Sequence, residues 1–166
     1  VDGKPDAFLV RANALAEWRP HKLFTLSAAP RAQWASDPLL AYEELSGGNF
    51  TIGRGFDPGT IIGDSGVGVA LEARYGSFVP ASTKAFAIQP FAFFDAVWVW
   101  NKDAAFAGLN PQKLYSTGGG MRVAYGDVGR LDVTLAVPVN PGGFLAYRPQ
   151  PRLLVSPTTQ FGGNAP

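Results

Sequence analysis

The chain has 166 residues, of which 46% are hydrophobic and 16% are charged, and its net charge is +1. So balanced a charge argues against a nucleic-acid-binding protein, which carries a basic surface. The absence of cysteine excludes a disulfide framework and a thiolate metal site, and a single histidine, His21, argues against a histidine metal site or a Ser-His-Asp triad. At this length the chain can form one domain.

Two alternating segments open the chain. Apolar and polar residues alternate over residues 6–18 and over residues 24–34, which predicts two β-strands. Residues 19–22, of sequence RPHK, are expected to form the turn between them, with His21 exposed to solvent. Neither a run of 18 apolar residues nor a signal-peptide pattern at residues 1–13 is present, so no transmembrane helix and no signal peptide are predicted.

The segment of residues 37–66 interrupts this alternation with many glycines and no period of its own. Connections longer than about 12 to 15 residues are usually functional loops or disordered linkers. The sequence IGRGF at residues 52–56 places an arginine between two glycines and beside an aromatic residue, which is not typical of a linker. We therefore expect a structured loop that folds back onto another part of the chain.

Alternation returns after the loop and predicts five further strands. They cover residues 67–75, 85–101, 113–126, 131–139 and 152–161. The strand over residues 85–101 carries one acid, Asp95, on a face that is otherwise apolar. The fold class predicted from the residues is therefore all-β, with about seven antiparallel strands.

The length and composition of these strands favour a membrane barrel over a soluble barrel or sandwich, which stays open as the alternative. Strands of roughly 9 to 17 residues are longer than the five or six usual in soluble sheets and suit tilted strands that cross a bilayer. Aromatic residues gather toward the strand ends, as in the interfacial girdles of outer-membrane barrels. They are Trp18, Trp34, Tyr75, Trp98, Trp100, Tyr115, Tyr125 and Phe161. Since a sheet in lipid cannot leave open edges and seven strands are too few for a barrel, the chain is expected to be the C-terminal part of a larger barrel.

Three motifs, in order along the chain, resemble the signature of the two-partner secretion translocators of the ShlB/FhaC/HecB type. The first is IGRGF followed by GDSGVGVALEAR at residues 63–74. The second is an F-x-D-x-G pattern, matched by Phe93 and Asp95 but with Val97 in place of the glycine. The third is an S-x-G-x-G-x-R pattern, and its matching residues are Ser116, Gly118, Gly120 and Arg122.

The resemblance implies the last seven strands of a 16-stranded barrel in the bacterial outer membrane, within the superfamily that also contains the barrel-assembly insertases. It implies that a signal peptide, a plug helix, the N-terminal barrel strands and two periplasmic POTRA domains lie upstream. Such a protein passes an unfolded partner exoprotein, for example a haemolysin or adhesin, through the outer-membrane lipid without ATP, cofactor or catalytic residue. An insertase of the same superfamily and a soluble β-barrel binding protein are the alternative functions.

The isolated acid at Asp95 predicts the contact that holds the loop. An unpaired carboxylate on an apolar face would cost several kcal/mol. Arg54 lies between Gly53 and Gly55, which add no side-chain bulk, so its guanidinium can approach a wall closely. A bidentate Arg54–Asp95 ion pair would satisfy both groups and fix residues 37–66 inside the lumen, and the resemblance implies the same pair. The alternative is a solvated Arg54, with Asp95 paired to Arg122 or Arg74.

The remaining predicted site residues fall into two sets. The loop motif comprises Ile52, Gly53, Gly55, Phe56, Gly63 and Asp64. The predicted pore-lining residues are Glu72, Arg74 and Arg122. Trp98 and Trp100 are expected to face lipid rather than to bind a ligand, and no spacing of acids resembles a calcium loop.

Overall fold

The computed structural model describes residues 3–48, 52–143 and 145–159, and this part of the chain is almost entirely β-structure. Its strands are β1 (Leu9–Asn13), β2 (Ala16–His21), β3 (Phe24–Ala35), β4 (Leu45–Gly47), β5 (Ile61–Gly63), β6 (Ser65–Tyr75), β7 (Phe86–Trp100), β8 (Gln112–Tyr125), β9 (Gly129–Pro138) and β10 (Arg152–Thr159). A 3-10 helix, η1 (Ala104–Leu109), lies between β7 and β8. Among the described residues no helix is long and apolar enough to span a membrane.

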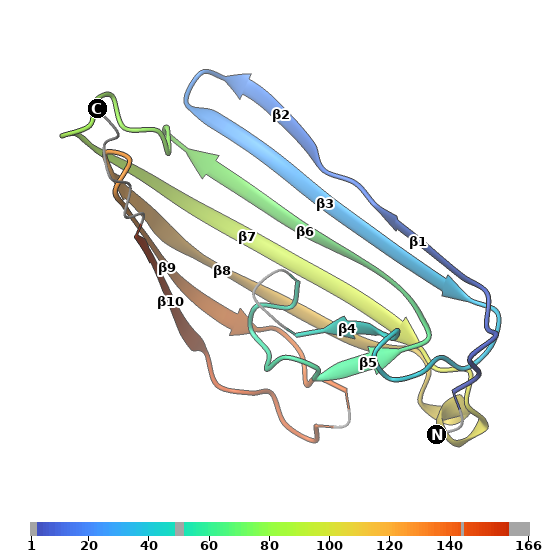
Figure 1. The fold of residues 1–166 in the computed structure, drawn as a ribbon. Helices are drawn as coiled ribbons and strands as arrows, with labels where there is room; N and C mark the ends of the chain where they lie inside the picture. Colours follow the sequence, from blue (N-terminus) through green and yellow to red (C-terminus); the bar gives the residue numbers. More distant parts are fainter. Residues whose placement is uncertain (1–2, 49–51, 144, 160–166) are drawn as a thin grey trace.

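Eight strands form one antiparallel sheet in the order β1-β3-β6-β7-β8-β9-β10, with β2 also paired to β3 (Figure 1). From β6 to β10 the neighbours in the sheet follow one another along the chain, whereas β3 and β6 are joined through the segment that contains β4 and β5. Strands β4 and β5 form a separate two-stranded sheet. The predicted all-β, antiparallel fold is confirmed.

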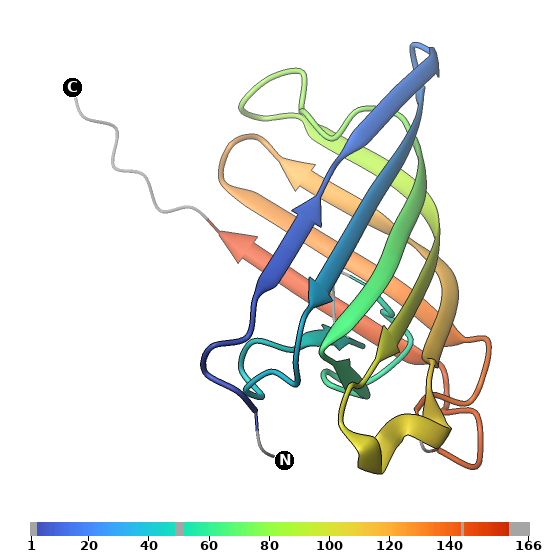
Figure 2. The same cartoon turned by 90° about the vertical axis from the view of Figure 1, so that its right-hand side faces the viewer.

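The large sheet curves like part of a cylinder wall, and β4 and β5 lie on its concave side (Figure 2). On β7, Phe91, Phe93 and Asp95 of the concave face are buried, whereas Ala92 and Phe94 on the opposite face are exposed. Large apolar side chains are exposed along that convex face. They include Val10, Trp18, Trp34, Val67, Leu71, Ile88, Phe94, Trp100, Met121, Leu135, Leu153 and Val155.

The first predicted strand, residues 6–18, is divided into β1 and β2. Both pair with β3, and the register continues across the break from Asn13 opposite Arg31 to Ala16 opposite Ala28. The break falls at Pro30 of β3, which has no N–H to donate, while the Ala14 N–H still bonds the Pro30 carbonyl at 3.0 Å. The β1–β2 break is therefore caused by the missing N–H of Pro30, and the chain keeps its direction along β3 across the break.

The predicted turn at residues 19–22 is wrong in its extent. Strand β2 continues to His21, which lies opposite Phe24, and a register shift between Trp18 and His21 admits the extra residue. The turn is reduced to Lys22 and Leu23. Because the bulge takes up one extra residue, β2 and β3 stay paired beyond Arg19 and Pro20, where the sequence predicts a turn.

The boundaries of residues 37–66 also differ from the prediction. Strands β4 and β5 lie within this segment, and β6 begins at Ser65. Strands of three residues are too short to show a period in the sequence, which is why they were not expected. At the other end of the chain β10 includes residues up to Thr159, and Phe161 lies outside the described residues.

The described part of the loop, residues 37–48 and 52–66, packs apolar side chains against the sheet. Ile52, Phe56 and Ile61 of this loop form one buried cluster with three side chains of the wall. The wall residues are Val97 and Val99 of β7 and Leu114 of β8. The loop is therefore a structured layer on the concave face, since all six side chains are almost fully buried.

Candidate functional site

The loop brings Arg54 to Asp95 of β7. The Arg54 guanidinium donates from Nη2 to Asp95 Oδ1 at 2.8 Å and from Nε to Oδ2 at 3.0 Å, which is a bidentate pair. Asp95 is completely buried, and Arg54 retains 9% of its exposure. Removing one partner of a buried pair costs about 3–5 kcal/mol, because the other charge is left uncompensated.

The Asp95 carboxylate also accepts hydrogen bonds from the loop backbone. The N–H groups of Gly53 and Arg54 donate to Oδ2 at 3.1 and 3.0 Å, and the Ser116 hydroxyl donates to the same oxygen at 3.3 Å. Gly53 has φ +76°, a conformation that a residue with a side chain rarely adopts, and this turns both N–H groups toward the wall. Asp95 therefore holds the loop by its main chain as well as by Arg54.

Glu72 of β6 is shared among three arginines. It accepts from Arg54 Nη1 at 3.0 Å and from Arg122 Nη1 and Nη2 at 2.7 and 3.0 Å, and Arg74 Nε lies 3.4 Å away. Its side chain is only 12% exposed, so these are largely desolvated contacts. Glu72 thus connects the Arg54–Asp95 pair to the two arginines predicted to line the pore.

The network continues across the sheet in both directions. Arg122 Nε donates to Asp132 Oδ2 on β9 at 2.9 Å, and Arg74 Nη2 donates to Glu17 Oε1 on β2 at 2.6 Å. Neither arginine pairs with Asp95, so the alternative partners considered for that acid are engaged elsewhere. From Glu17 to Asp132 the described side chains form one continuous line of ion pairs over the concave face.

Two phenylalanines of β7 lie beneath this line. Arg54 Cζ is 3.6 Å from the ring centroid of Phe93, and Arg122 Cζ is 4.2 Å from that of Phe91, which are cation–π distances. The rings in turn lie against glycines of β8: a Cβ at Gly118 would be 2.8 Å from Phe93 Cε1, and one at Gly120 would be 2.9 Å from Phe91 Cζ. Each arginine therefore stacks on a phenylalanine ring whose position requires a glycine on the neighbouring strand β8.

The other loop-motif residues lie at close contacts. A Cβ at Gly55 would be 2.8 Å from the Pro138 nitrogen, and one at Gly63 would be 2.9 Å from Val99 Cβ, so both glycines permit close approach to the wall. The Asp64 carboxylate accepts from the backbone N–H of Leu39 and, at 2.7 Å, from that of Lys102. Asp64 thereby joins the start of the loop to the β7–β8 connection.

Sequence reasoning did not find Asp132, Glu17 or the stacking role of Phe91. Asp132 lies directly opposite Arg122 in the β8–β9 register, so an arginine and an acid on facing positions of a predicted hairpin were the available signal. Glu17 could not be found in this way, because Arg74 reaches it across the intervening strand β3.

One loop carboxylate lacks a partner. Glu44 Oε2 is buried and accepts no hydrogen bond within the described part of the chain. Burial, followed by the negative charge of Asp64, raises the pKa of the Glu44 carboxyl above its ordinary value. Asp37, at the start of the loop, has a pKa below its ordinary value instead, because its carboxylate accepts a hydrogen bond from Lys4 Nζ at 2.6 Å.

The sequence profile of the family described as "Haemolysin secretion/activation protein ShlB/FhaC/HecB" matches residues 3–123. The chain belongs to this family. The predicted membership among the two-partner secretion translocators, a class of outer-membrane β-barrel transporters, is thereby confirmed. The match to the ShlB/FhaC/HecB family includes Arg54, Glu72, Asp95 and Arg122, whereas Asp132 lies beyond it.

A solved structure supports the same fold. "CdiB from Escherichia coli" resembles the chain with a TM-score of 0.71 and 19% sequence identity, over 89% of this chain and 26% of the CdiB chain. The chain therefore spans about a quarter of the CdiB chain and has the fold of that part. No curated protein matches by sequence.

Proposed function

We propose that this chain is the C-terminal barrel part of an outer-membrane pore that secretes, and can activate, a partner exoprotein such as a haemolysin or adhesin without ATP. Membership of the ShlB/FhaC/HecB family supports this proposal. So does the distribution of side chains, because the convex face is apolar where a barrel meets lipid and the concave face carries the ion pairs. The N-terminal barrel strands, the POTRA domains and a signal peptide belong upstream in this proposal.

The observation that carries the proposal is the loop held against the concave wall. The described residues of this loop, 37–48 and 52–66, occupy the side that would be the lumen, and the Arg54–Asp95 pair together with two backbone hydrogen bonds fixes them there. In that position the loop obstructs a path through the barrel. We therefore assign Arg54 and Asp95 as a loop-to-wall latch that must open for an exoprotein to pass, and Glu72, Arg74 and Arg122 as pore-lining residues.

Reversing the charge of Arg54 tests the latch. In the full-length protein, Arg54→Asp places a third acid beside Asp95 and Glu72, so we expect the loop to leave the wall. Because the proposed latch has to close as well as open in each round of export, we expect secretion of the partner to fall at least roughly tenfold. The measurement is the amount of exoprotein in the medium, with protease sensitivity of residues 37–66 as the readout of loop release.

The matched control is Arg31→Asp. Arg31 of β3 also lies on the concave face, opposite Gly68 of β6, and among the described residues it makes no ion pair. The control variant should secrete normally. Equal secretion by Arg54→Asp and the parent, with the loop shown to be released, would remove the latch from the mechanism.

The same cells distinguish the alternative functions. An insertase would be revealed if Arg54→Asp lowered the amount of unrelated outer-membrane proteins while secretion of the partner was unchanged. A soluble binding protein would be extracted by aqueous buffer without detergent. We do not expect extraction by buffer, because the convex face exposes many large apolar side chains. We do not expect the insertase result, because the matching family is one of secretion and activation proteins.

A further inference from the structure

The wall around Asp95 is a binding site that the structure shows with its occupant in place. The occupant is the tip of the loop, where the Arg54 guanidinium donates two hydrogen bonds to the carboxylate, at 2.8 and 3.0 Å. The N–H groups of Gly53 and Arg54 donate two more, at 3.1 and 3.0 Å. Asp95 therefore recognises a short piece of polypeptide backbone as well as a positive charge.

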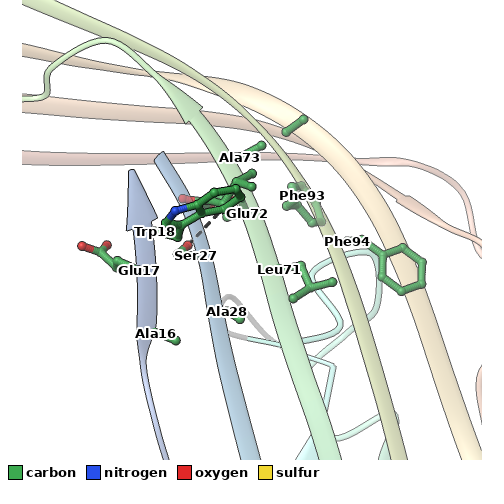
Figure 3. A pocket seen from close by; sticks show the side chains of 12 residues that line it. Ala16, Glu17, Trp18, Ser27, Ala28, Leu71, Glu72, Ala73, Phe93 and Phe94 are labelled. Carbon is green, nitrogen blue, oxygen red and sulfur yellow. Dashed lines mark hydrogen bonds between the residues drawn. The ribbon is translucent and has the colours of Figure 1, made fainter. Parts of the chain in front are cut away.

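Phe93 makes the site selective for arginine. Arg54 Cζ lies 3.6 Å from the centroid of the Phe93 ring. A planar guanidinium can stack on a ring and donate two parallel hydrogen bonds from its edge, whereas the ammonium of lysine cannot do both. The next residue along β7, Phe94, lies with Leu71 along a pocket of the convex face (Figure 3), so Phe93 is the ring of the two that serves the lumenal side.

The residues on either side of the arginine are selected as well. Gly53 has φ +76°, which turns the two N–H groups toward Asp95 and which a residue with a side chain rarely adopts. A Cβ at Gly55 would be 2.8 Å from the Pro138 nitrogen and 3.0 Å from Ser116 Cβ, both of which belong to the wall. The wall is therefore complementary to the sequence Gly-Arg-Gly.

Release of the loop leaves this site without its occupant. Asp95 is completely buried, and a buried carboxylate that loses its cation is costly. The two other arginines of the network, Arg74 and Arg122, are held by acids of their own. Arg31 makes no ion pair among the described residues, but β6 lies between its strand, β3, and the strand of Asp95. A replacement arginine from the passing exoprotein would remove the cost of opening.

The site can be reached from the lumen while the loop is still docked. Arg54 borders a cavity of about 250 Å³ on the concave face, together with Asp132, Thr134 and Ser156. The Asp132 side chain is 36% exposed, so its carboxylate can receive an arriving guanidinium beside Arg54. Exchange of one arginine for another therefore does not require the Arg54–Asp95 pair to break first.

We infer that the exoprotein opens the latch by exchange, in which a Gly-Arg-Gly turn of the passing chain takes the place of residues 53–55 on Asp95. The inference rests on the proposed function, because it assigns a partner to the same latch. It names the chemical feature of the exoprotein that the wall recognises, which is an arginine flanked by glycines.

A tripeptide tests the exchange in the parent protein. Acetyl-Gly-Arg-Gly-amide is added to the full-length protein in lipid vesicles, and chymotrypsin cleavage after Phe56 reports loop release. Phe56 is 1% exposed in the docked loop, and chymotrypsin leaves the tripeptide intact. We expect a saturating amount of the tripeptide to speed this cleavage at least roughly fivefold, because it shifts the loop toward its released state.

Three related tripeptides control for charge, shape and backbone. Citrulline in place of arginine keeps the shape without the charge and should have no effect. Lysine in place of arginine should require about tenfold more peptide. Acetyl-Ala-Arg-Ala-amide should fail, because the positions of Gly53 and Gly55 do not accept a Cβ.

Direct binding removes the competition with the loop. A fluorescein-labelled Gly-Arg-Gly peptide should bind full-length Arg54→Ala about tenfold more tightly than the parent, since the site no longer holds its own guanidinium. Addition of Asp95→Asn should abolish that binding. The matched control is Asp57→Asn, which removes the exposed 3.0 Å pair between the loop and Arg152 without altering the site, and it should keep the response of the parent.

Two results would overturn the inference. One is equal potency of the citrulline and arginine tripeptides, or no binding to folded Arg54→Ala. The other is binding to Arg54→Ala only after Arg31→Gln is added, which would show that Arg31 takes the vacated place on Asp95. Neither assay contains an exoprotein or measures export, so such a failure concerns this inference alone, while secretion by Arg54→Asp tests the proposed function separately.

Discussion

At the scale of single residues, the hydrogen bonds that Asp95 needs determine where the loop lies on the concave face. A fully buried carboxylate must receive donors from every side, and it receives them from one guanidinium, two amides and one hydroxyl. An asparagine or glutamate at position 95 could not accept all of them in the same geometry. The loop position is therefore specified by one residue of the wall.

The glycine beneath Phe93 is expected to be as sensitive as the ion pair above it. In Gly118→Ala the new Cβ would clash with the Leu135 carbonyl oxygen and lie 2.8 Å from the Phe93 ring. Either the strands separate or the ring moves, so we expect a loss of about 1–3 kcal/mol in the free energy of unfolding. Urea unfolding in lipid vesicles measures it.

Gly129→Ala is the control for that substitution, because no atom lies within 4 Å of a Cβ added at Gly129. It should leave the free energy of unfolding unchanged. If Gly118→Ala were equally harmless, the stacked arrangement of Gly118, Phe93 and Arg54 would not contribute to stability.

Glu44 predicts how the loop responds to pH. The folded-state pKa of Glu44 is raised, so its contribution favours the docked loop below the ordinary value of 4.5 and is lost as the pH rises through the folded-state value. Glu44→Gln carries no charge and should protect the loop from proteolysis better than the parent does at neutral pH. The two proteins should converge near pH 4, and a difference that persists there would assign the effect to something other than ionisation.

At the scale of elements, the loop and the wall touch at a glycine-lined seam on β6. A Cβ at Gly68 would clash with Ile52 Cδ1 and lie 3.3 Å from Val97 Cβ, so the loop packs directly on the strand backbone. Replacing the long Ile52 side chain with cysteine leaves room for a sulfur atom on each side. The pair Ile52→Cys and Gly68→Cys therefore places two thiols at this contact, where a disulfide would join loop and wall.

We expect oxidation of this double-cysteine variant to block secretion of the partner and reduction to restore it. Gly68→Cys alone controls for the tighter packing and should not respond to oxidant. Undiminished secretion with the disulfide shown to be closed would mean that this part of the loop stays on the wall during export.

The elements also show where sequence reasoning succeeds and where it does not. Long strands such as β7 and β8 follow from their alternation, because a period of two over fourteen or fifteen residues is unambiguous. Strands β4 and β5 do not, because three residues show no period and their pairing depends on the fit of Ile61 against the wall. The break at Pro30 is visible in the sequence but becomes meaningful only when its partner, Ala14, is known.

The same distinction applies to the candidate site. A lone acid on an apolar face indicates that a cation is needed, and the paired glycines around Arg54 indicate which cation can approach. The sharing of Glu72 by three arginines depends on lateral distances across the sheet, which no local pattern contains. The family motifs accordingly mark individual residues of the network without describing their connections.

At the scale of the whole molecule, the described sheet is unsuited to water. Its convex face is covered by large exposed apolar residues, and the outer edges of β2 and β10 have no neighbouring strand among the described residues. We therefore expect residues 1–166, produced alone, to aggregate in aqueous buffer and to disperse only in detergent. Light scattering after size-exclusion chromatography tests this, and a stable monomer in buffer would contradict a lipid-facing surface.

The uneven sharing of partners in the ion-pair network has a consequence for ion flow. When Arg54 leaves with the loop, Glu72 keeps Arg122 and lies beside Arg74, but Asp95 keeps only the Ser116 hydroxyl. Within the network, Arg74 and Arg122 then remain beside four carboxylates, which are Glu17, Glu72, Asp95 and Asp132. This stretch of the wall should accordingly attract cations when the loop is away, and do so less when the loop is docked.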